Sequence, residues 1–462
     1  MHCGYITQLK NLREHPNADR LMLADCFGNT VCVPKDTSYE NQIVAYFPSD
    51  LQLSVEYATH NNLVRRKDDA GNNVGGYLDP EKRNIRAIKL RGEKSDGITM
   101  PLESFAYTGV KISDLIIGTQ ITVLNGHEIC CKYVPRSHKQ NTSERGNRTR
   151  KTKVPIAPLF QEHADTGQLA YNLSAFKPGD EIEITLKMHG TSQRTANLPV
   201  LTGYKRTLWD RIMRRPGTPI YEYGGVSGTR RVVLESYEGG FYGSNEFREQ
   251  HSKTFDGKLW KGETVYYEVV GFTHTGAPIM ASCDNKKLND KEFIKQYGKE
   301  TVFSYGCSPT GEGEIIDYWD EAKTEPCTVR IVPQSDIYIY RMTMTNEDGE
   351  VVEYTPDFMR YRCELMGVKT VPILWKGTIP EQPEDIEGDI TAGEWIKIKA
   401  EEYYDGPDPI GKTHVREGVV VRIVNRPKFT AYKHKNFSFK VLEGIIKEVA
   451  EAPDMEEAQD GE

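Results

Sequence analysis

The chain has 462 residues, of which 38% are hydrophobic and 27% charged, and its formal net charge at pH 7 is −8. This length and composition predict a globular protein of about two to three domains. The acidic balance argues against a protein that binds nucleic acid over its whole surface, so any such site must be local.

The sequence also argues against a membrane or secreted protein. No apolar run approaches the roughly 18–20 residues that a membrane-spanning helix needs, and residues 1–21 lack the basic start and apolar core of a secretory signal. The nine cysteines are scattered, and the adjacent Cys130 and Cys131 make a poor disulfide or zinc pair. We therefore expect reduced thiols, a cytoplasmic location and no membrane partner.

Residues 1–125 are predicted to be rich in β-strands. The stretches NTVCVP and NQIVAYFPSDLQL are short β-branched and aromatic runs, and NIRAIKLRGEKSDGITMPL is typical of two strands joined by a charged turn. Several short strands in a region of this size suit a small barrel, of which the OB-fold is the commonest that binds nucleic acid. The candidate residues for contact with a nucleic-acid strand are Tyr46, Phe47, Arg65, Arg66 and Lys67.

Residues 126–154 are predicted to be a basic linker. Residues 132–153 carry eight Lys or Arg and one Glu, with almost no apolar side chain. Such a stretch is either a solvated hinge without a partner or an arm that becomes ordered on binding. So many cations in an acidic protein favour contact with phosphates. The candidate contact residues are Arg145, Arg148, Arg150 and Lys151.

Residues 155–449 show a mixed pattern of strands and helices, and the acidic residues 450–462 are expected to form a disordered tail. DKEFIKQYG and TPDFMRYRCELMG are predicted helices, the second with a Thr-Pro-Asp start and a glycine stop. Strand-like runs are DEIEITLK, RRVVLES, ETVYYEVVGF, PCTVRIVPQSDIYIYRMTM, EGVVVRIV and NFSFKVLEGIIKEV.

Three charged residues in this region lie in or next to predicted strands. Lys187 ends a run and precedes the turn Met-His-Gly, Glu268 lies inside VYYEVVGF, and Glu417 opens EGVVVR. A lysine amine can act as a nucleophile where its neutral form is favoured, and glutamate oxygens are hard ligands for Mg²⁺.

Two pairs of residues with a spacing of two complete this set. Tyr338 and Tyr340 share one face of their strand and could stack on a nucleobase. Lys433 and Lys435 also share a face, and with Arg422 they could bind phosphate oxygens. In one cleft these residues would provide the stacking, cations, carboxylates and phosphate acceptor that a nucleoside triphosphate site needs.

The motifs KMHG, YYEVVG, DIYIYR, EGVVVR and KHKN follow the order of the motifs of covalent nucleotidyltransferases, which are ATP-dependent ligases and mRNA capping enzymes. VSGTRRVVL, FYGSNEFREQHSKTFDGKLWKGETVYYEVVGF, KHKNFSFKVLEGI and IRAIKLRG most resemble RNA ligases with an N-terminal OB domain. The resemblance implies an α+β chain: an OB-like β-barrel, the linker, and a nucleotidyltransferase domain in residues 155–449, with ligase or ATP-grasp-like antiparallel sheets and helices.

The resemblance implies a reaction in three steps. Lys187 would attack the α-phosphate of ATP, AMP would pass to the 5′-phosphate of an RNA end, and a 3′-hydroxyl would seal the strand, as in nick sealing or RNA repair. The implied cofactors are ATP and Mg²⁺ or Mn²⁺. The implied partner of a monomeric chain is RNA, as single-stranded ends or a nicked duplex.

The resemblance also assigns the site residue by residue. Lys187 would be catalytic, and Glu268 and Glu417 would bind the metal. The nucleotide would contact His189, Gly190, Arg206, Glu268, Tyr338, Tyr340, Lys433 and Lys435.

Three features depart from the family pattern. His189 stands where Asp is commoner, and Leu186 stands where Glu often precedes the lysine. A neutral imidazole can still donate or accept a hydrogen bond. The long separation of Glu268 from Glu417 implies an insertion, around residues 307–323 or 370–408.

Other functions fit parts of this pattern. A DNA ligase or a GTP-dependent capping enzyme shares the motifs, although those enzymes usually place the OB domain after the nucleotidyltransferase domain. A non-catalytic RNA-binding protein with this fold would not need the complete set of motif residues. Any single motif also fits a surface turn or a core strand, so the interpretation depends on their common order.

Neutralising Arg145, Arg148, Arg150 and Lys151 together should weaken RNA binding and flatten its dependence on salt, because fewer counterions are released from the RNA. Formation of a lysyl–AMP should be unaffected. Filter binding at several salt concentrations, alongside a self-adenylylation assay, checks this; equal loss of both activities would show that the linker is structural.

Overall fold

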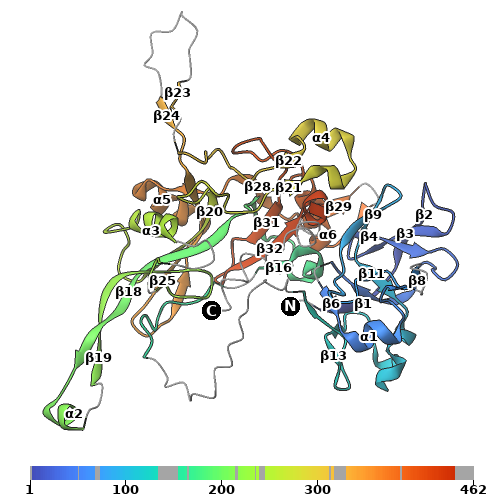
Figure 1. The fold of residues 1–462 in the computed structure, drawn as a ribbon, viewed down its shortest axis with the longest axis horizontal. Helices are drawn as coiled ribbons and strands as arrows, with labels where there is room; N and C mark the ends of the chain where they lie inside the picture. Colours follow the sequence, from blue (N-terminus) through green and yellow to red (C-terminus); the bar gives the residue numbers. More distant parts are fainter. Residues whose placement is uncertain are drawn as a thin grey trace, which may run out of the picture. The chain divides into compact units, whose positions relative to one another are not determined.

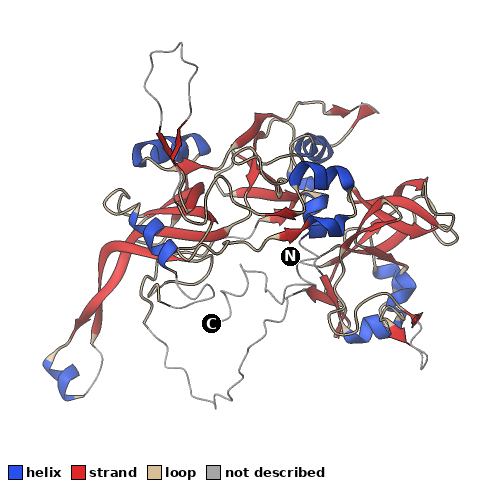
Figure 2. Cartoon of the chain, turned by 45° about the horizontal axis from the view of Figure 1, so that its top comes forward, coloured by secondary structure: helices blue, strands red, loops and turns tan. Residues whose placement is uncertain are grey.

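The computed structural model describes residues 3–49, 51–67, 73–133, 154–163, 166–213, 217–234, 236–238, 245–311, 314–316, 329–385 and 388–442. The predicted linker contacts Arg145, Arg148, Arg150 and Lys151 lie outside the described residues, as does the predicted acidic tail, residues 450–462. Strands dominate and nearly all pair antiparallel, so the fold is mixed α+β (Figure 2). No helix among the described residues is long and apolar enough to cross a membrane.

The chain divides into two compact units (Figure 1). Unit 1 is Met1–Pro135 with Phe437–Ala450, and unit 2 is Arg136–Asn436 with Glu451–Glu462. Unit 1 thus extends past residue 125, because β15 (Cys130–Lys132) pairs with β6 (Leu51–Leu53).

Unit 1 consists of short sheets around one apolar core. The other strands are β1 (Gly4–Gln8), β2 (Lys10–Glu14), β3 (Leu21–Cys26), β4 (Asn29–Pro34), β5 (Ile43–Phe47), β7 (Arg66–Lys67), β8 (Asn73–Gly75), β9 (Ala87–Leu90), β10 (Glu93–Asp96), β11 (Ile98–Met100), β12 (Gln120–Ile121), β13 (Val123–Leu124) and β14 (His127–Glu128). The helices are α1 (Val55–His60), η1 (Leu102–Thr108) and η2 (Ile112–Asp114). The largest sheet runs β11-β5-β1-β12, and the described strands form several sheets rather than one closed barrel.

Two aromatic residues expected to contact nucleic acid lie inside unit 1. Tyr46 and Phe47 are fully buried on β5, which lies between β11 and β1. The Tyr46 hydroxyl donates a hydrogen bond to the Asp96 carbonyl, at 2.5 Å. The prediction of an exposed platform at these two residues is therefore wrong, because both faces of β5 are covered: Phe47 belongs to the apolar core, and the Tyr46 ring lies 6.2 Å from that of Phe27. Arg65 and Arg66 are exposed.

Residues 437–442 are helical and belong to unit 1, although they follow the last strand of unit 2. Phe437, Phe439 and Leu442 are buried, and Lys440 pairs with Asp96. The strand predicted for NFSFKVLEGIIKEV is wrong over these residues, because burial of the apolar side chains within unit 1 overrides their strand propensity.

Unit 2 is built on two sheets. The first has the order β16-β32-β31-β17-β28, and the second the order β19-β18-β20-β25-β26 with β27 beside β25. These strands are β16 (Gly167–Gln168), β17 (Glu181–Lys187), β18 (Thr191–Lys205), β19 (Thr218–Gly228), β20 (Glu263–Gly271), β25 (Ser335–Thr345), β26 (Val351–Glu353), β27 (Lys369–Thr370), β28 (Ile373–Thr378), β31 (Gly418–Ile423) and β32 (Thr430–Lys435).

Smaller elements connect these strands. They are η3 (Leu169–Tyr171), η4 (Leu173–Ala175), α2 (Leu208–Ile212), α3 (Glu246–Lys253), β21 (Cys283–Asp284), η5 (Asn285–Leu288), α4 (Lys291–Tyr297), β22 (Glu300–Thr301), β23 (Glu314–Ile316), β24 (Val329–Ile331), α5 (Pro356–Met366), β29 (Glu384–Asp385), β30 (Gly388–Asp389) and α6 (Ala392–Glu401). Both predicted helices are confirmed as α4 and α5; Thr355 caps α5 and Gly367 ends it at φ 70°. RRVVLES contains only an isolated bridge at Val233, so that predicted strand is not formed in the described residues.

Strand β18 extends far beyond its sheet. It pairs with β20 only over residues 191–196, and further out it pairs with β19 alone. This two-stranded hairpin arm, formed by residues 197–205 and 218–225, carries α2 at its end (Figure 1). Elements of both sheets lie between Glu268 and Glu417 in the sequence. Strands β25 to β27 extend the second sheet, whereas β28 is part of the first sheet and α6 packs against it.

A buried ion pair fixes α5 to β20. Glu263 is fully buried and accepts hydrogen bonds from Arg362 at 2.8 and 2.7 Å and from the Tyr354 hydroxyl at 3.0 Å.

Glu263→Ala should lower the free energy of unfolding by about 3–5 kcal/mol, because the Arg362 charge stays buried without its partner. Urea denaturation checks this. Glu249→Ala, which breaks the exposed pair with Lys253, should cost less than about 1 kcal/mol, and similar losses for both variants would contradict the prediction.

Candidate active site

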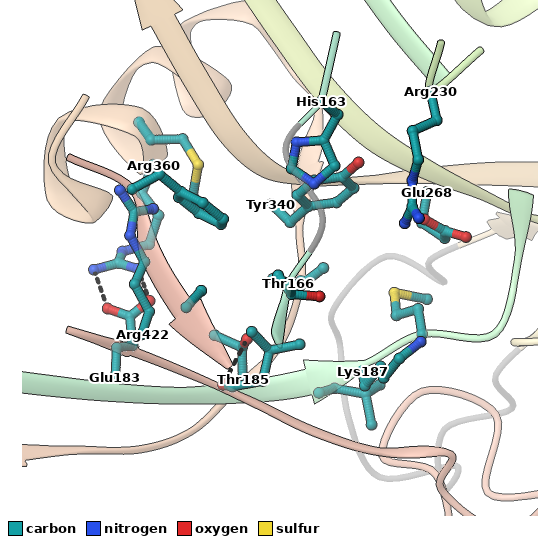
Figure 3. Close-up of a pocket in the computed structure, with 17 residues that line it drawn as sticks. His163, Thr166, Glu183, Thr185, Lys187, Arg230, Glu268, Tyr340, Arg360 and Arg422 are labelled. Atoms are coloured by element: carbon teal, nitrogen blue, oxygen red, sulfur yellow. Dashed lines mark hydrogen bonds and ion pairs between the residues drawn. The ribbon is translucent and has the colours of Figure 1, made fainter. Parts of the chain in front are cut away.

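The first sheet presents Lys187 at the end of β17. Side chains alternate between the two faces of a strand, so Ile182 and Ile184 pack against α6 while Glu183, Thr185 and Lys187 lie on the opposite face. The three side chains line a cavity that is partly open to solvent (Figure 3).

The register of three strands places a carboxylate between two lysines. Lys187 of β17 lies opposite Gly418 of β31, which lies opposite Lys435 of β32. Glu417, the residue before Gly418, is 2% exposed. Its Oε1 lies 2.8 Å from Lys187 Nζ and 3.4 Å from Lys435 Nζ. The two lysines therefore share one buried carboxylate oxygen.

The second oxygen of Glu417 suits a metal ion. Among the described residues, Glu417 Oε2 accepts no hydrogen bond although it is buried, and it lies 3.7 Å from His189 Nδ1. A buried carboxylate oxygen without a donor is energetically costly. Glu268 lines the cavity from the second sheet and adds a further hard oxygen donor. Carboxylate oxygens are ligands that Mg²⁺ and Mn²⁺ prefer, although the described residues contain no group of three or more His, Cys, Asp or Glu side chains placed to hold a metal ion.

Gly190 allows the turn after Lys187 to lie directly against the second sheet. A Cβ atom at residue 190 would lie 2.4 Å from the Val269 carbonyl oxygen and 2.9 Å from Glu268 Cγ. Any other residue would push β18 away from β20. The glycine therefore keeps Lys187 and Glu268 at the same end of the cavity.

The second sheet contributes an aromatic wall. Ile337 and Ile339 of β25 face the core, so Tyr338 and Tyr340 share the other face. Tyr340 lines the cavity, with its ring centroid 5.2 Å from that of His163. Tyr338 is 5% exposed and pairs with Glu268 across the strands. Of the two rings, Tyr340 is the one that borders the cavity.

Buried ion pairs close the end of the cavity away from Lys187 (Figure 3). Arg360 of α5 donates hydrogen bonds to Glu183 at 2.8 and 3.0 Å. Glu353 of β26 pairs with Arg341 at 3.0 Å and with Arg422 at 3.3 Å. Burial raises the pKa of Glu353, and the two arginines act to lower it. These pairs tie the two sheets together around the cavity.

The structure brings most of the predicted site residues together. Those at or beside the cavity are Lys187, His189, Gly190, Glu268, Tyr340, Glu417 and Lys435. Lys433 lies opposite Val420 and two residues before Lys435, so it shares the cavity face of β32. Arg206 is not at the cavity, because β18 continues into the hairpin arm and Arg206 is exposed at its far end.

Arg230 occupies the cavity instead. It follows β19 and lies beside Glu268 (Figure 3). Arg230 belongs to VSGTRRVVL, so a signal for it was present in the sequence. Glu183 could also have been found, because an even spacing places it on the Lys187 face. His163 and Arg360 carry no comparable signal, because only tertiary packing brings them to the cavity.

No family model matches the chain, and no curated protein matches its sequence. Solved structures of an RNA ligase from Naegleria gruberi do match its fold. An apo mutant has 14% identity over 95% of this chain and 98% of that one, with a TM-score of 0.54. A mutant with AMP and Mn has 13% identity over 95% and 98%, with a TM-score of 0.51. A mutant with ATP and Mn has 13% identity over 95% and 98%, with a TM-score of 0.50.

At this level of identity, the similarity establishes a shared fold. The chain therefore has the fold of an RNA ligase over nearly its whole length. That fold agrees with the architecture implied by the five motifs.

Arg230→Ala should weaken binding of ATP, the ligand predicted from the sequence, by about tenfold or more, because it removes a cation from the cavity. Arg206→Ala is the matched control and should leave the ATP affinity unchanged. Isothermal titration with ATP and Mg²⁺ checks both variants. A larger loss for the Arg206 variant would show that the arm contributes to the nucleotide site.

Proposed function

We propose that the chain is an ATP-dependent RNA ligase of the covalent nucleotidyltransferase type. The observation that carries the proposal is the cluster of Lys187, Glu417 and Lys435 on adjoining strands, at one end of the cavity. The shared fold supports it, since the RNA ligase from Naegleria gruberi has been solved with ATP or AMP and Mn.

In the first step, Lys187 Nζ attacks the α-phosphorus of ATP. A phosphorus–nitrogen bond forms, the bond to the β-phosphate oxygen breaks, and pyrophosphate leaves. The amine must lose a proton, and Glu417 Oε1, 2.8 Å away, is within reach to accept it. Lys435 and Lys433 lie on the same strand face and would neutralise the α-phosphate. The products are lysyl–AMP and pyrophosphate.

In the second step, a 5′-phosphate oxygen of an RNA end attacks the AMP phosphorus. The phosphorus–nitrogen bond breaks, and the lysine amine regains its proton. In the third step, a 3′-hydroxyl attacks the 5′-phosphorus, AMP leaves, and the strand is sealed. The overall reaction consumes one ATP and yields AMP and pyrophosphate.

Glu417 and Glu268 would hold Mg²⁺ or Mn²⁺. The bound cation would offset negative charge on the phosphate oxygens of ATP. Tyr340 would stack on the base, and Arg230 would contact the phosphates or ribose.

The remaining assignments belong to the same proposal. Unit 1 would be an OB-like RNA-binding domain, the basic residues that follow it would be a linker that contacts the RNA, and unit 2 would be the nucleotidyltransferase domain. The enzyme would act as a monomer in the cytoplasm, on RNA ends or nicks.

The test uses α-labelled ATP or GTP with Mn²⁺, followed by a denaturing gel. Wild-type protein should become labelled with ATP, with the acid lability of a phosphoramidate, and Lys187→Ala should lose the label entirely. Lys177→Ala, which changes an exposed lysine, is the control and should label as wild type does. Absence of any label on wild-type protein would refute the ligase mechanism. Labelling with GTP alone would instead indicate a capping enzyme.

A further inference from the structure

Tyr305 lies outside every motif, yet it contacts the turn that follows the candidate nucleophile. Its hydroxyl accepts a hydrogen bond from the backbone N–H of His189, at 2.7 Å. Tyr305 is 2% exposed. Burial raises the pKa of its hydroxyl well above the ordinary value, so the group stays neutral. The contact joins residues that are distant in sequence.

The backbone at Tyr305 is held in an unfavourable conformation. Its φ is 46°, in the left-handed region, and Gly306 follows at φ 78°. A bulky residue rarely adopts this conformation, because its Cβ atom crowds the backbone. Such strain persists only where the surrounding structure imposes it, and it often occurs at functional sites.

Aromatic and histidine rings hold Tyr305 in place. Its ring centroid lies 4.6 Å from that of the fully buried His414, edge to face. Phe303 lies 5.2 Å from His414 and 4.6 Å from His189, also edge to face. Phe303 and Tyr305 thus contact the side chain and the backbone of His189, respectively.

A buried aspartate organises the loop behind these rings. Asp408 accepts hydrogen bonds from the backbone N–H groups of Ile410, Gly411 and Lys412, at 3.0, 2.7 and 2.9 Å. A Cβ atom on Gly411 would lie 3.0 Å from the Gly306 nitrogen. The close packing of these two loops supports the strained backbone at Tyr305.

We propose that Tyr305 is a positioning residue for Lys187, held by Phe303, His414 and the Asp408 loop, and that it fixes the nucleophile turn through the backbone of His189. The proposal rests on the proposed function, since it concerns the attack of Lys187 on the α-phosphate. Here a hydroxyl from a distant loop holds the nucleophile turn.

The test replaces Tyr305 with Phe, which removes the acceptor and keeps the ring. The rate of self-adenylylation at saturating ATP should fall at least about tenfold, because a small displacement of an attacking group strongly slows a reaction. The KM for ATP should stay unchanged. Sealing of an RNA whose 5′ end already carries AMP should keep its wild-type rate, because that step does not need attack by Lys187.

Tyr57→Phe is the matched control, because it removes another buried tyrosine hydroxyl, bonded to Ser104 in unit 1. It should leave self-adenylylation unchanged. Melting temperatures of both variants show whether each one folds.

Unchanged self-adenylylation in Tyr305→Phe would overturn the proposal. An equal loss of self-adenylylation and of sealing of adenylylated RNA would also overturn it, in favour of a general structural role. Wild-type protein that never becomes labelled would instead refute the proposed function, and the positioning role with it.

Discussion

The ion pairs of the Glu417 carboxylate with Lys187 and Lys435 are the interaction on which the rest of the site depends. Without it, the ammonium groups of Lys187 and Lys435 would repel each other in a partly buried place. The strand register that creates this contact tolerates no slip, because a shift by one residue would turn the lysines to the opposite face. Gly418 permits the close approach of β31 and β32 in this register, since a Cβ atom there would collide with the His434 carbonyl oxygen, and its φ is 150°.

Much of this arrangement could be predicted from the sequence, because it depends on alternation within strands. Lys187, Glu268, Glu417 and Lys435 each lie on a strand, or next to a strand end, that the residue pattern predicts. Once the strands pair, period-two alternation decides which side chains share a face. The order of the motifs then indicated one site, and the structure brings these four residues to one end of a cavity.

The rest of the site could not be predicted, because it depends on the path of the chain between strands. The spacing of Arg206 from Lys187 in the sequence suggested a contact with the nucleotide. The hairpin arm places Arg206 away from the cavity, and the chain returns to the cavity at Arg230. Tyr305 and His414 lie in connecting loops without any periodic pattern. Tyr46 and Phe47 show the same limit in unit 1, because composition does not tell whether both faces of a strand are covered by other parts of the fold.

Residues 437–442 complete unit 1 although about 300 residues of unit 2 precede them in the chain. A ribosome adds roughly 5–20 residues per second. Synthesis of unit 2 therefore separates the first part of unit 1 from its buried residues Phe439 and Leu442 by on the order of 15–60 s. Until then, the part of unit 1 against which these side chains pack lacks its cover. Unit 1 is therefore the first unit to emerge during synthesis, and it cannot be complete until unit 2 has been synthesised.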